Sequence, residues 1–300
     1  MPKAGGGGAA DMAPSVVPTP DAAARPLPRL ADMTSGPPSP ALPAGPAAHL
    51  RGEHLTVSLG GHRVLTDATV RINAGSRLGI VGENGRGKTT LLQIIAGFLE
   101  PTEGTVMIGS AHIDGPSPER GVVFQAATLY PWLSVRRNVE FGPKMRGVPK
   151  QERENKASAM LELVGLTGFG ERRPYELSGG MQQRAQIARV LVNDPRLILM
   201  DEPYGALDPL TRERLQVELL GIWRRERKTI IFVTHSVEEA VFLSTRVLVM
   251  SARPGRISID RRIELPGDTP DGVRSPAVIA TPEFQQLKLE LAEAIYAAHD

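Results

Sequence analysis

The chain has 300 residues and a net charge of +2, and its length suits one large domain or two small ones. It has no cysteine, which excludes disulfides and thiolate-bound metals, and no apolar run approaches the roughly 18 residues of a membrane-spanning helix. The mild charge argues against a nucleic-acid partner, because the basic cluster at residues 224–228 surrounds Glu226 and is more typical of a solvated helix end.

Residues 1–49 are rich in proline, alanine and glycine and poor in large apolar side chains. Such a composition cannot bury a core, so we expect a disordered tail. The segment lacks the apolar region of a signal peptide, and its many prolines fit poorly with an amphipathic transit peptide.

A short apolar strand at residues 78–81 leads into a glycine-rich loop, and a helix at residues 90–97 follows. The loop carries three glycines, Gly82, Gly85 and Gly87. These let the backbone turn tightly and point several N–H groups at one anion. Lys88 adds a charge for the β- and γ-phosphates of a nucleotide, and the Thr89 hydroxyl can ligate Mg²⁺. Strand, loop and helix together favour a phosphate site over a chance glycine-rich turn, because the helix N-terminus adds about half a positive charge.

Two helical patterns follow. Residues 150–165 carry apolar side chains at helical spacing, which indicates a helical region inserted into an α/β core. Leu177-Ser-Gly-Gly-Met181 opens a second helix. Ser178 suits a simple N-cap, whereas its hydroxyl and the amides of Gly179 and Gly180 could also form an anion site. On spacing alone the cap is favoured.

Residues 197–200 form a continuous apolar run, as in a parallel strand covered on both faces. The run delivers Asp201 and Glu202 to its carboxyl end, where open α/β sheets bind ligands. We expect Asp201 to hold Mg²⁺ through water and Glu202 to accept a proton from an attacking water. A third strand, residues 229–234, ends at His235, which is then predicted to bond the γ-phosphate and orient that water.

The last segment begins with a linker at residue 266. Thr281-Pro-Glu283 is a typical helix start, and an apolar stripe follows at Phe284, Leu287, Leu291 and Ile295. We expect this stripe to pack on the domain rather than to bind a partner.

Taken in this order, the chain resembles the ATP-binding subunits of ABC transporters over residues 50–265. The resemblance rests on the Walker A loop at 82–90, a Q-loop glutamine at Gln125, the signature at 177–184, Walker B at 197–202, a D-loop at 206–208 and a switch histidine at His235. Finer features resemble the nitrate, sulfonate and taurine importer branch, namely residues 114–121, residues 131–138, Met181 in the signature and residues 251–256.

The resemblance implies an α/β fold, a P-loop NTPase of the ABC type with an inserted α-helical subdomain at about residues 126–194. The ATPase domain would span 50–265, between the tail at 1–49 and a linker and C-terminal helix at 266–300.

The resemblance also implies a homodimer whose two copies face each other head to tail, with ATP between them. One copy would contact the nucleotide through Leu59, Gly82, Glu83, Asn84, Gly85, Arg86, Gly87, Lys88, Thr89, Thr90 and Gln125, and the other through Ser178, Gly179 and Gly180. Mg²⁺ would be held by Thr89, Gln125 and Asp201, and catalysis would use Glu202, His235 and Lys88. Asp208 is expected to lie across the dimer seam.

The implied activity is ATP hydrolysis that energises import of a small anion, with an aliphatic sulfonate or taurine favoured and nitrate or a related solute as the alternative. The partners would be a polytopic membrane permease, received beside the aromatic segment 130–133, and indirectly an extracytoplasmic solute-binding protein. The protein would be peripheral at the cytoplasmic face of the cell membrane. A non-transport ATPase is less favoured because repeats and long heptads are missing, and an inactive regulatory module because Lys88, Glu202 and His235 are present.

Two positions depart from the family pattern. Leu59 stands where an aromatic residue usually stacks on adenine, which predicts weaker nucleotide binding unless Leu59 covers the base by apolar contact alone. Arg86 stands where the loop often carries a small residue. We expect its side chain to face solvent rather than to add charge near the phosphates.

Overall fold

The computed structural model describes residues 49–205, 207–251, 254–266, 268 and 274–298. Of the tail expected at residues 1–49, residues 1–48 lie outside this range. Ala206 of the D-loop segment, and residues 252–253 of the importer-like segment 251–256, lie outside it as well. Within the described part of the chain, every helix falls short of the length and apolar character that crossing a bilayer requires.

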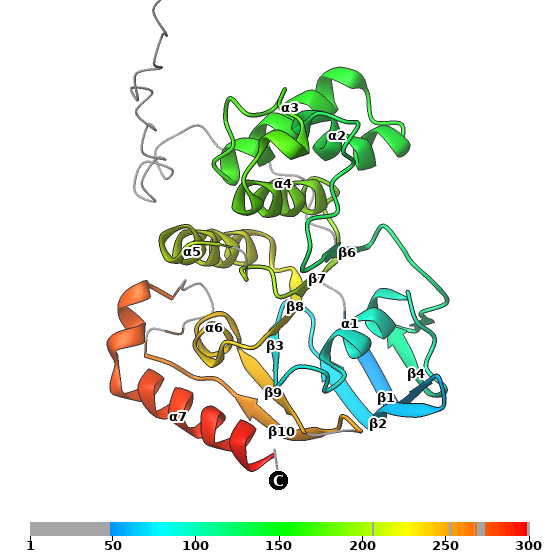
Figure 1. Ribbon diagram of the computed structural model, residues 1–300, viewed down its shortest axis with the longest axis vertical. Helices are drawn as coiled ribbons and strands as arrows, with labels where there is room; N and C mark the ends of the chain where they lie inside the picture. The colour runs from blue at the N-terminus through cyan, green and yellow to red at the C-terminus, as the bar shows by residue number, and fades with distance from the viewer. Residues whose placement is uncertain (1–48, 206, 252–253, 267, 269–273, 299–300) are drawn as a thin grey trace, which may run out of the picture. The chain divides into compact units, whose positions relative to one another are not determined.

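A six-stranded sheet forms the centre of the described structure (Figure 1). Its strands, in spatial order, are β10 (Ile257–Arg262), β9 (Arg246–Met250), β3 (Arg77–Val81), β8 (Thr229–Thr234), β7 (Leu197–Asp201) and β6 (Arg120–Val123). The five strands from β9 to β6 are parallel, and β10 pairs antiparallel with β9. The carboxyl ends of β3, β7 and β8 therefore lie next to one another, which is the arrangement that the three predicted strands required.

Strand β7 divides its side chains between two hydrophobic cores. Leu197 and Leu199 belong to one core, and Ile198 and Met200 belong to the other. β8 repeats this alternation, because successive side chains of a strand point to opposite faces. Both faces of the sheet are covered, as the continuous apolar run in the sequence predicted.

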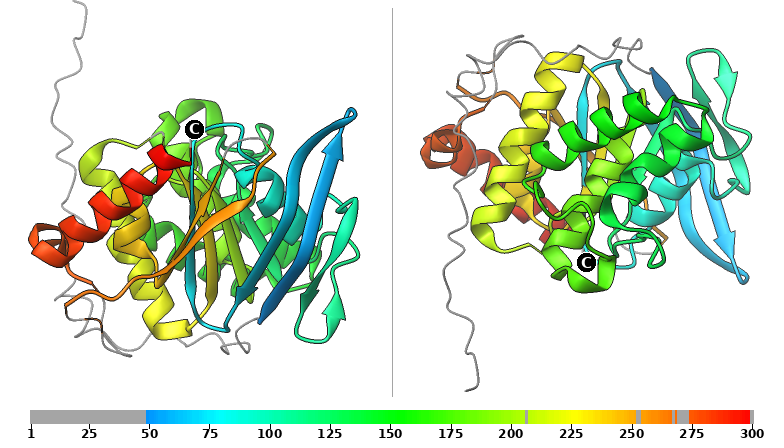
Figure 2. Two further views of the ribbon diagram at one scale, coloured as in Figure 1. Left: turned by 90° about the horizontal axis from the view of Figure 1, so that it is seen from below. Right: turned by 90° about the horizontal axis from the view of Figure 1, so that it is seen from above.

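A second sheet, antiparallel throughout, covers one face. Its order is β2 (His62–Ile72), β1 (Leu50–Leu59), β4 (Glu103–Ile108) and β5 (Ala111–His112). Helix α1 (Lys88–Ala96) contacts both β2 and the strands β7 and β8, and its buried leucines and isoleucines fill the core between the two sheets. Figure 2 shows this second sheet, with β1 and β2 in blue, beside the central sheet.

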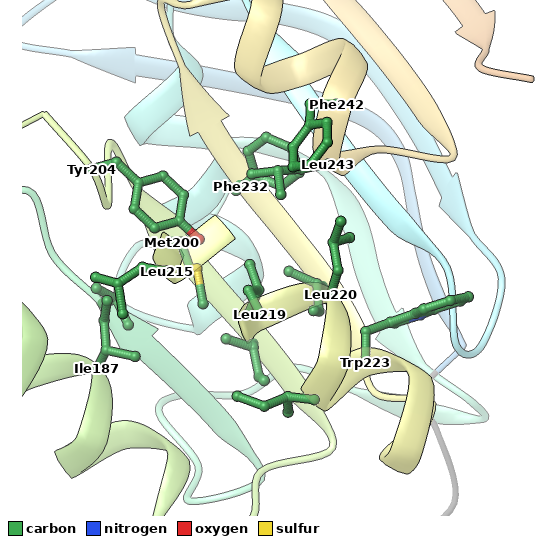
Figure 3. Packing of buried hydrophobic residues seen from close by; sticks show 14 of the residues in the cluster. Ile187, Met200, Tyr204, Leu215, Leu219, Leu220, Trp223, Phe232, Phe242 and Leu243 are labelled. Atoms are coloured by element: carbon green, nitrogen blue, oxygen red, sulfur yellow. The ribbon is translucent and has the colours of Figure 1, made fainter. Parts of the chain in front are cut away.

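The other face is covered by helices. Helices α2 (Val135–Met145), α3 (Lys150–Leu163) and α4 (Gly179–Leu191) pack on one another in the segment between β6 and β7. Helices α5 (Pro209–Glu226) and α6 (Val237–Leu243) follow β7 and β8, and α7 (Pro282–Ala297) lies against α6 and β9. Figure 3 shows how Leu215, Leu219 and Leu220 of α5 fill the core beside Met200 and Phe232. The predicted α/β class with an all-helical insertion is confirmed.

Candidate functional site

The glycine-rich loop after β3 uses the backbone freedom that the sequence predicted. Gly85 and Gly87 have φ values of 76° and 85°, a region that favours glycine. Gly87 is also the N-cap of α1. The Lys88 ammonium folds back over the loop and donates to the carbonyls of Gly82 and Glu83, each at 2.8 Å. Burial lowers the pKa of Lys88, against the opposing effect of the Glu202 and Asp201 carboxylates.

A cavity of about 460 Å³ opens over this loop. It is lined by His62, Arg63, Val64, Asn84, Gly85, Gly87, Lys88, Thr89, Thr90, Gln125 and Glu202. Its size is in the range of small-molecule sites. The sequence-predicted site residues from the loop, the Q-loop and Walker B therefore meet at one place.

Strand β2 contributes three lining residues that the sequence analysis did not identify, His62, Arg63 and Val64. They follow the Gly60-Gly61 turn, which joins β1 to β2 and pairs Leu59 with His62. That glycine pair is a hairpin signal, which predicts the turn but not its place at the cavity. Leu59 itself is 47% exposed, and the described lining residues of the cavity do not include it.

The first turn of α1 and the end of β7 meet at Thr89 and Asp201. The Thr89 hydroxyl donates to Asp201 Oδ1 at 3.2 Å. Burial raises the pKa of Asp201, while the bond from Thr89 acts in the opposite direction. A hydroxyl and a carboxylate are hard oxygen donors of the kind that Mg²⁺ prefers, so this pair fits a magnesium ion.

Glu202 is the centre of a small polar network. Gln125 Nε2 donates to Glu202 Oε2 at 3.1 Å, and His235 Nδ1 lies 3.3 Å from the same oxygen. The Glu202 backbone N–H donates to Val233 O at 2.9 Å, which ties it to the neighbouring strand. The carboxylate is largely buried, whereas the His235 side chain is 63% exposed. A buried carboxylate beside an exposed imidazole suits proton transfer to and from a ligand in the cavity.

Ser178 is the N-cap of α4, and its hydroxyl accepts from the Met181 backbone N–H at 3.3 Å. Ser178 and Gly179 are exposed, and Gly180 is half-buried. None of the three is among the described lining residues of the cavity. Asp208 is likewise an N-cap, since its carboxylate accepts from the Thr211 backbone N–H at 3.0 Å. Hydrogen bonds from Thr211 lower the pKa of Asp208.

The expectation that Arg86 faces solvent is wrong. Arg86 is only 5% exposed, and its guanidinium donates to Glu83 Oε2 and to the carbonyl of Ala298. The side chain is long enough to reach the end of α7, which is more than 200 positions later in the chain, and this contact withdraws it from water. The neighbouring Asn84 and Gly85 line the cavity instead.

Comparison with known proteins gives consistent matches. The ABC transporter family model matches residues 65–205. A taurine import ATP-binding protein of Roseobacter denitrificans is 52% identical over 201 residues, covering 67% of this chain and 75% of that protein. A nitrate import ATP-binding protein of Synechocystis sp. is 46% identical over 233 residues, covering 77% and 87%. An ATP-binding cassette solved as a dimer in a post-hydrolysis state with ADP and Pi is similar in structure, with a TM-score of 0.64, 29% identity, and coverage of 72% of this chain and 99% of that one.

Proposed function

Because the chain belongs to the ATP-binding subunits of ABC transporters, we propose that its ATP hydrolysis energises the import of a small anion, an aliphatic sulfonate or taurine. The observation that carries the ATP hydrolysis is the meeting of Lys88, Gln125 and Glu202 around one cavity of about 460 Å³, and the imported solute is inferred from the relatives. The sulfonate class is proposed because taurine import proteins of several organisms, at 45–52% identity, are among the relatives; a nitrate import protein at 46% makes nitrate the alternative.

In the proposed mechanism the loop amides and Lys88 bind the β- and γ-phosphates of ATP. Lys88 then exchanges its bonds to the Gly82 and Glu83 carbonyls for bonds to phosphate oxygens. Thr89, Asp201 and Gln125 would hold Mg²⁺, which when bound neutralises charge on the phosphates. These assignments rest on the oxygen-bearing side chains at the start of α1, after β6 and at the end of β7.

Glu202 is proposed as the general base and His235 as the residue that orients the attacking water. The contact between His235 and Glu202, at 3.3 Å, supports a shared role. The water oxygen attacks the γ-phosphorus while the Glu202 carboxylate accepts a proton from that water. The bond between the γ-phosphorus and the oxygen that bridges it to the β-phosphate breaks. Hydrolysis thus yields ADP and inorganic phosphate.

Each cavity would be completed by a second copy of the chain. Ser178, Gly179 and Gly180 stand outside the cavity of their own copy and present a helix N-terminus, which is suited to an anion. A homodimer facing head to tail would bring them to the partner's triphosphate, with Asp208 at the seam. The dimeric state of the solved cassette with ADP and Pi supports this arrangement.

The proposed membrane partner is a polytopic permease that docks beside the Q-loop, at the cytoplasmic face of the cell membrane. Trp132 is 69% exposed there, and Tyr130 packs against both Trp132 and Phe141 at ring-centroid distances of 5.4 and 4.8 Å. An exposed aromatic surface of this kind is typical of a protein interface. A solute-binding protein outside the membrane would deliver the anion to that permease.

Uptake of labelled solutes tests the proposal. A strain lacking this chain should lose uptake of taurine or an alkanesulfonate, and the wild-type gene should restore it, whereas the Glu202→Gln gene should not. Loss of nitrate uptake with intact taurine and sulfonate uptake would replace the proposed substrate class. If all of these uptakes stayed intact and the purified protein still hydrolysed ATP, the import role would be rejected.

A further inference from the structure

The Arg86 side chain joins two parts of the fold that are distant in sequence. One guanidinium nitrogen donates to Ala298 O at 2.9 Å, and another donates to Glu83 Oε2 at 2.5 Å. Ala298 is the C-cap of helix α7. Unpaired carbonyls at a helix C-terminus carry about half a negative charge, so a buried cation is stabilised there.

Helix α7 is held firmly enough to serve as an anchor. Phe284, Leu287 and Leu291 are buried in the core of the α/β domain. Lys288 pairs with Glu238 of α6 at 2.6 Å, and Glu290 pairs with Arg261 of β10 at 3.0 Å. Figure 1 shows α7, in red, running beside α6 and towards the region of β10. Its last turn therefore has a defined position relative to the phosphate loop.

The Arg86 backbone is confined as well. A Cβ atom added at Gly255, in the connection between β9 and β10, would lie 2.1 Å from the Arg86 carbonyl oxygen. Gly255 is itself fixed to β2, since its N–H donates to Val64 O at 2.9 Å. The loop is thus held on its backbone by this connection and on its side chain by α7.

We infer that Arg86 is a positioning residue for nucleotide binding, which fastens the phosphate loop to the C-terminal end of α7. It acts on the loop through Glu83, whose carboxylate accepts from Arg86. The helix end thereby helps to hold the loop in the shape that binds phosphate. This inference rests on the proposed location of ATP in the cavity over the loop. The competing explanation is that the Arg86 charge meets the nucleotide directly.

The test is a double-mutant cycle on the full chain, with ATP turnover and thermal unfolding measured for each variant. Arg86→Ser removes the donor, and deletion of residues 296–300 removes the acceptor carbonyl while keeping Phe284, Leu287 and Leu291. Each change alone should raise the KM for ATP about 5-fold, which corresponds to about 1 kcal/mol, the net contribution of a typical hydrogen bond. Because both changes break the same link, their combination should raise KM no further. The kcat should stay within about twofold of wild type, since no group that meets the reacting atoms is altered.

Two matched variants sharpen the cycle. Arg86→Lys keeps a positive charge that can reach one acceptor, so it should raise KM less than Arg86→Ser does. Glu293→Ala changes an exposed side chain of α7 that the anchoring contacts do not use, and it should leave KM unchanged.

The inference fails if Arg86→Ser leaves KM at the wild-type value. It also fails if Arg86→Ser raises KM but the deletion does not, because Arg86 would then contact the nucleotide directly. Additive effects in the double variant would also overturn it. Amide hydrogen exchange of residues 82–87 without nucleotide gives a separate readout, and the deletion should speed it. A loop unaffected by the deletion contradicts the inference alone, whereas a wild-type protein that turns over no ATP contradicts the proposed function.

Discussion

Glu202 has a backbone φ of 45°, in the left-handed region that few residues other than glycine adopt. Such a conformation costs on the order of 1–3 kcal/mol, and it persists only where the surroundings enforce it. Here the bond from its N–H to Val233 O supplies that constraint. In this conformation the carboxylate contacts Gln125 and His235, so the unusual backbone conformation belongs to the residue that we propose as the general base.

Glu202→Gln should lower ATP turnover by roughly 10²–10⁴, the usual contribution of a general base. The amide keeps the size and the backbone contacts of the carboxylate, so nucleotide binding should be retained. Phosphate release measures the loss of turnover, and equilibrium ATP binding measures the retained affinity. Glu213→Gln, an exposed change on α5, is the control, and a Glu202→Gln protein with near-normal turnover would remove Glu202 from the mechanism.

Leu59→Tyr tests how the base is held. A tyrosine ring stacked on adenine adds ~1–3 kcal/mol, so we expect ATP to bind more tightly in the variant. Inorganic tripolyphosphate, which has no base, should bind equally to both proteins, and calorimetry can measure both ligands. Unchanged ATP affinity would mean that Leu59 covers the base sufficiently, or that the β2 residues His62, Arg63 and Val64 hold it.

At the scale of elements, α5 carries an ionisable group into the contact with α4. Burial raises the pKa of Glu218 to about 7, although Arg214 and Arg184 act in the opposite direction. Its Oε2 atom is buried without a hydrogen-bond partner among the described residues. The folded state therefore favours the neutral carboxyl, while the unfolded chain ionises near the ordinary value of 4.5.

This difference makes stability depend on pH. Below about pH 4.5 both states are protonated, and the free energy of unfolding should fall as the pH rises from there through about 7. Glu218→Gln should flatten this dependence and raise the free energy of unfolding at pH 8, by at most about 3 kcal/mol. Urea unfolding at pH 5 and pH 8 measures it, with Glu213→Gln on the exposed side of α5 as the control. An equal pH slope in wild type and Glu218→Gln would contradict the prediction.

At the scale of the whole molecule, the proposed head-to-tail dimer makes a distinctive prediction for mixtures. Ser178→Arg should block the partner's site, and Glu202→Gln should inactivate its own site, so each homodimer loses turnover. A mixed dimer has one site with both defects and one intact site. Mixing the two inactive proteins should therefore restore phosphate release in part. Continued inactivity, with mixed dimers shown to form, would reject the shared site.

The site was predictable from the sequence as far as it depends on local patterns. The apolar run at residues 197–200 indicated a strand covered on both faces, and the polar residues after three such strands indicated one common edge. His62 and Arg63 were missed because their place at the cavity depends on how one sheet packs on another. Arg86 was misjudged because its acceptor, Ala298, reaches it only through the packing of α7. Contacts between distant segments leave no periodicity or spacing for a single sequence to reveal.

The division of β7 between two cores also sets how accurately Asp201 and Glu202 are placed. Sliding the strand by one residue would send Leu199 to the side of Met200 and Met200 to the side of Leu199, so both packing layers would resist together. An insertion or deletion of a single residue in this strand should therefore be far more damaging than one in the exposed Gly60-Gly61 turn. Apolar side chains that make no contact with the nucleotide site thus fix the positions of the two carboxylates.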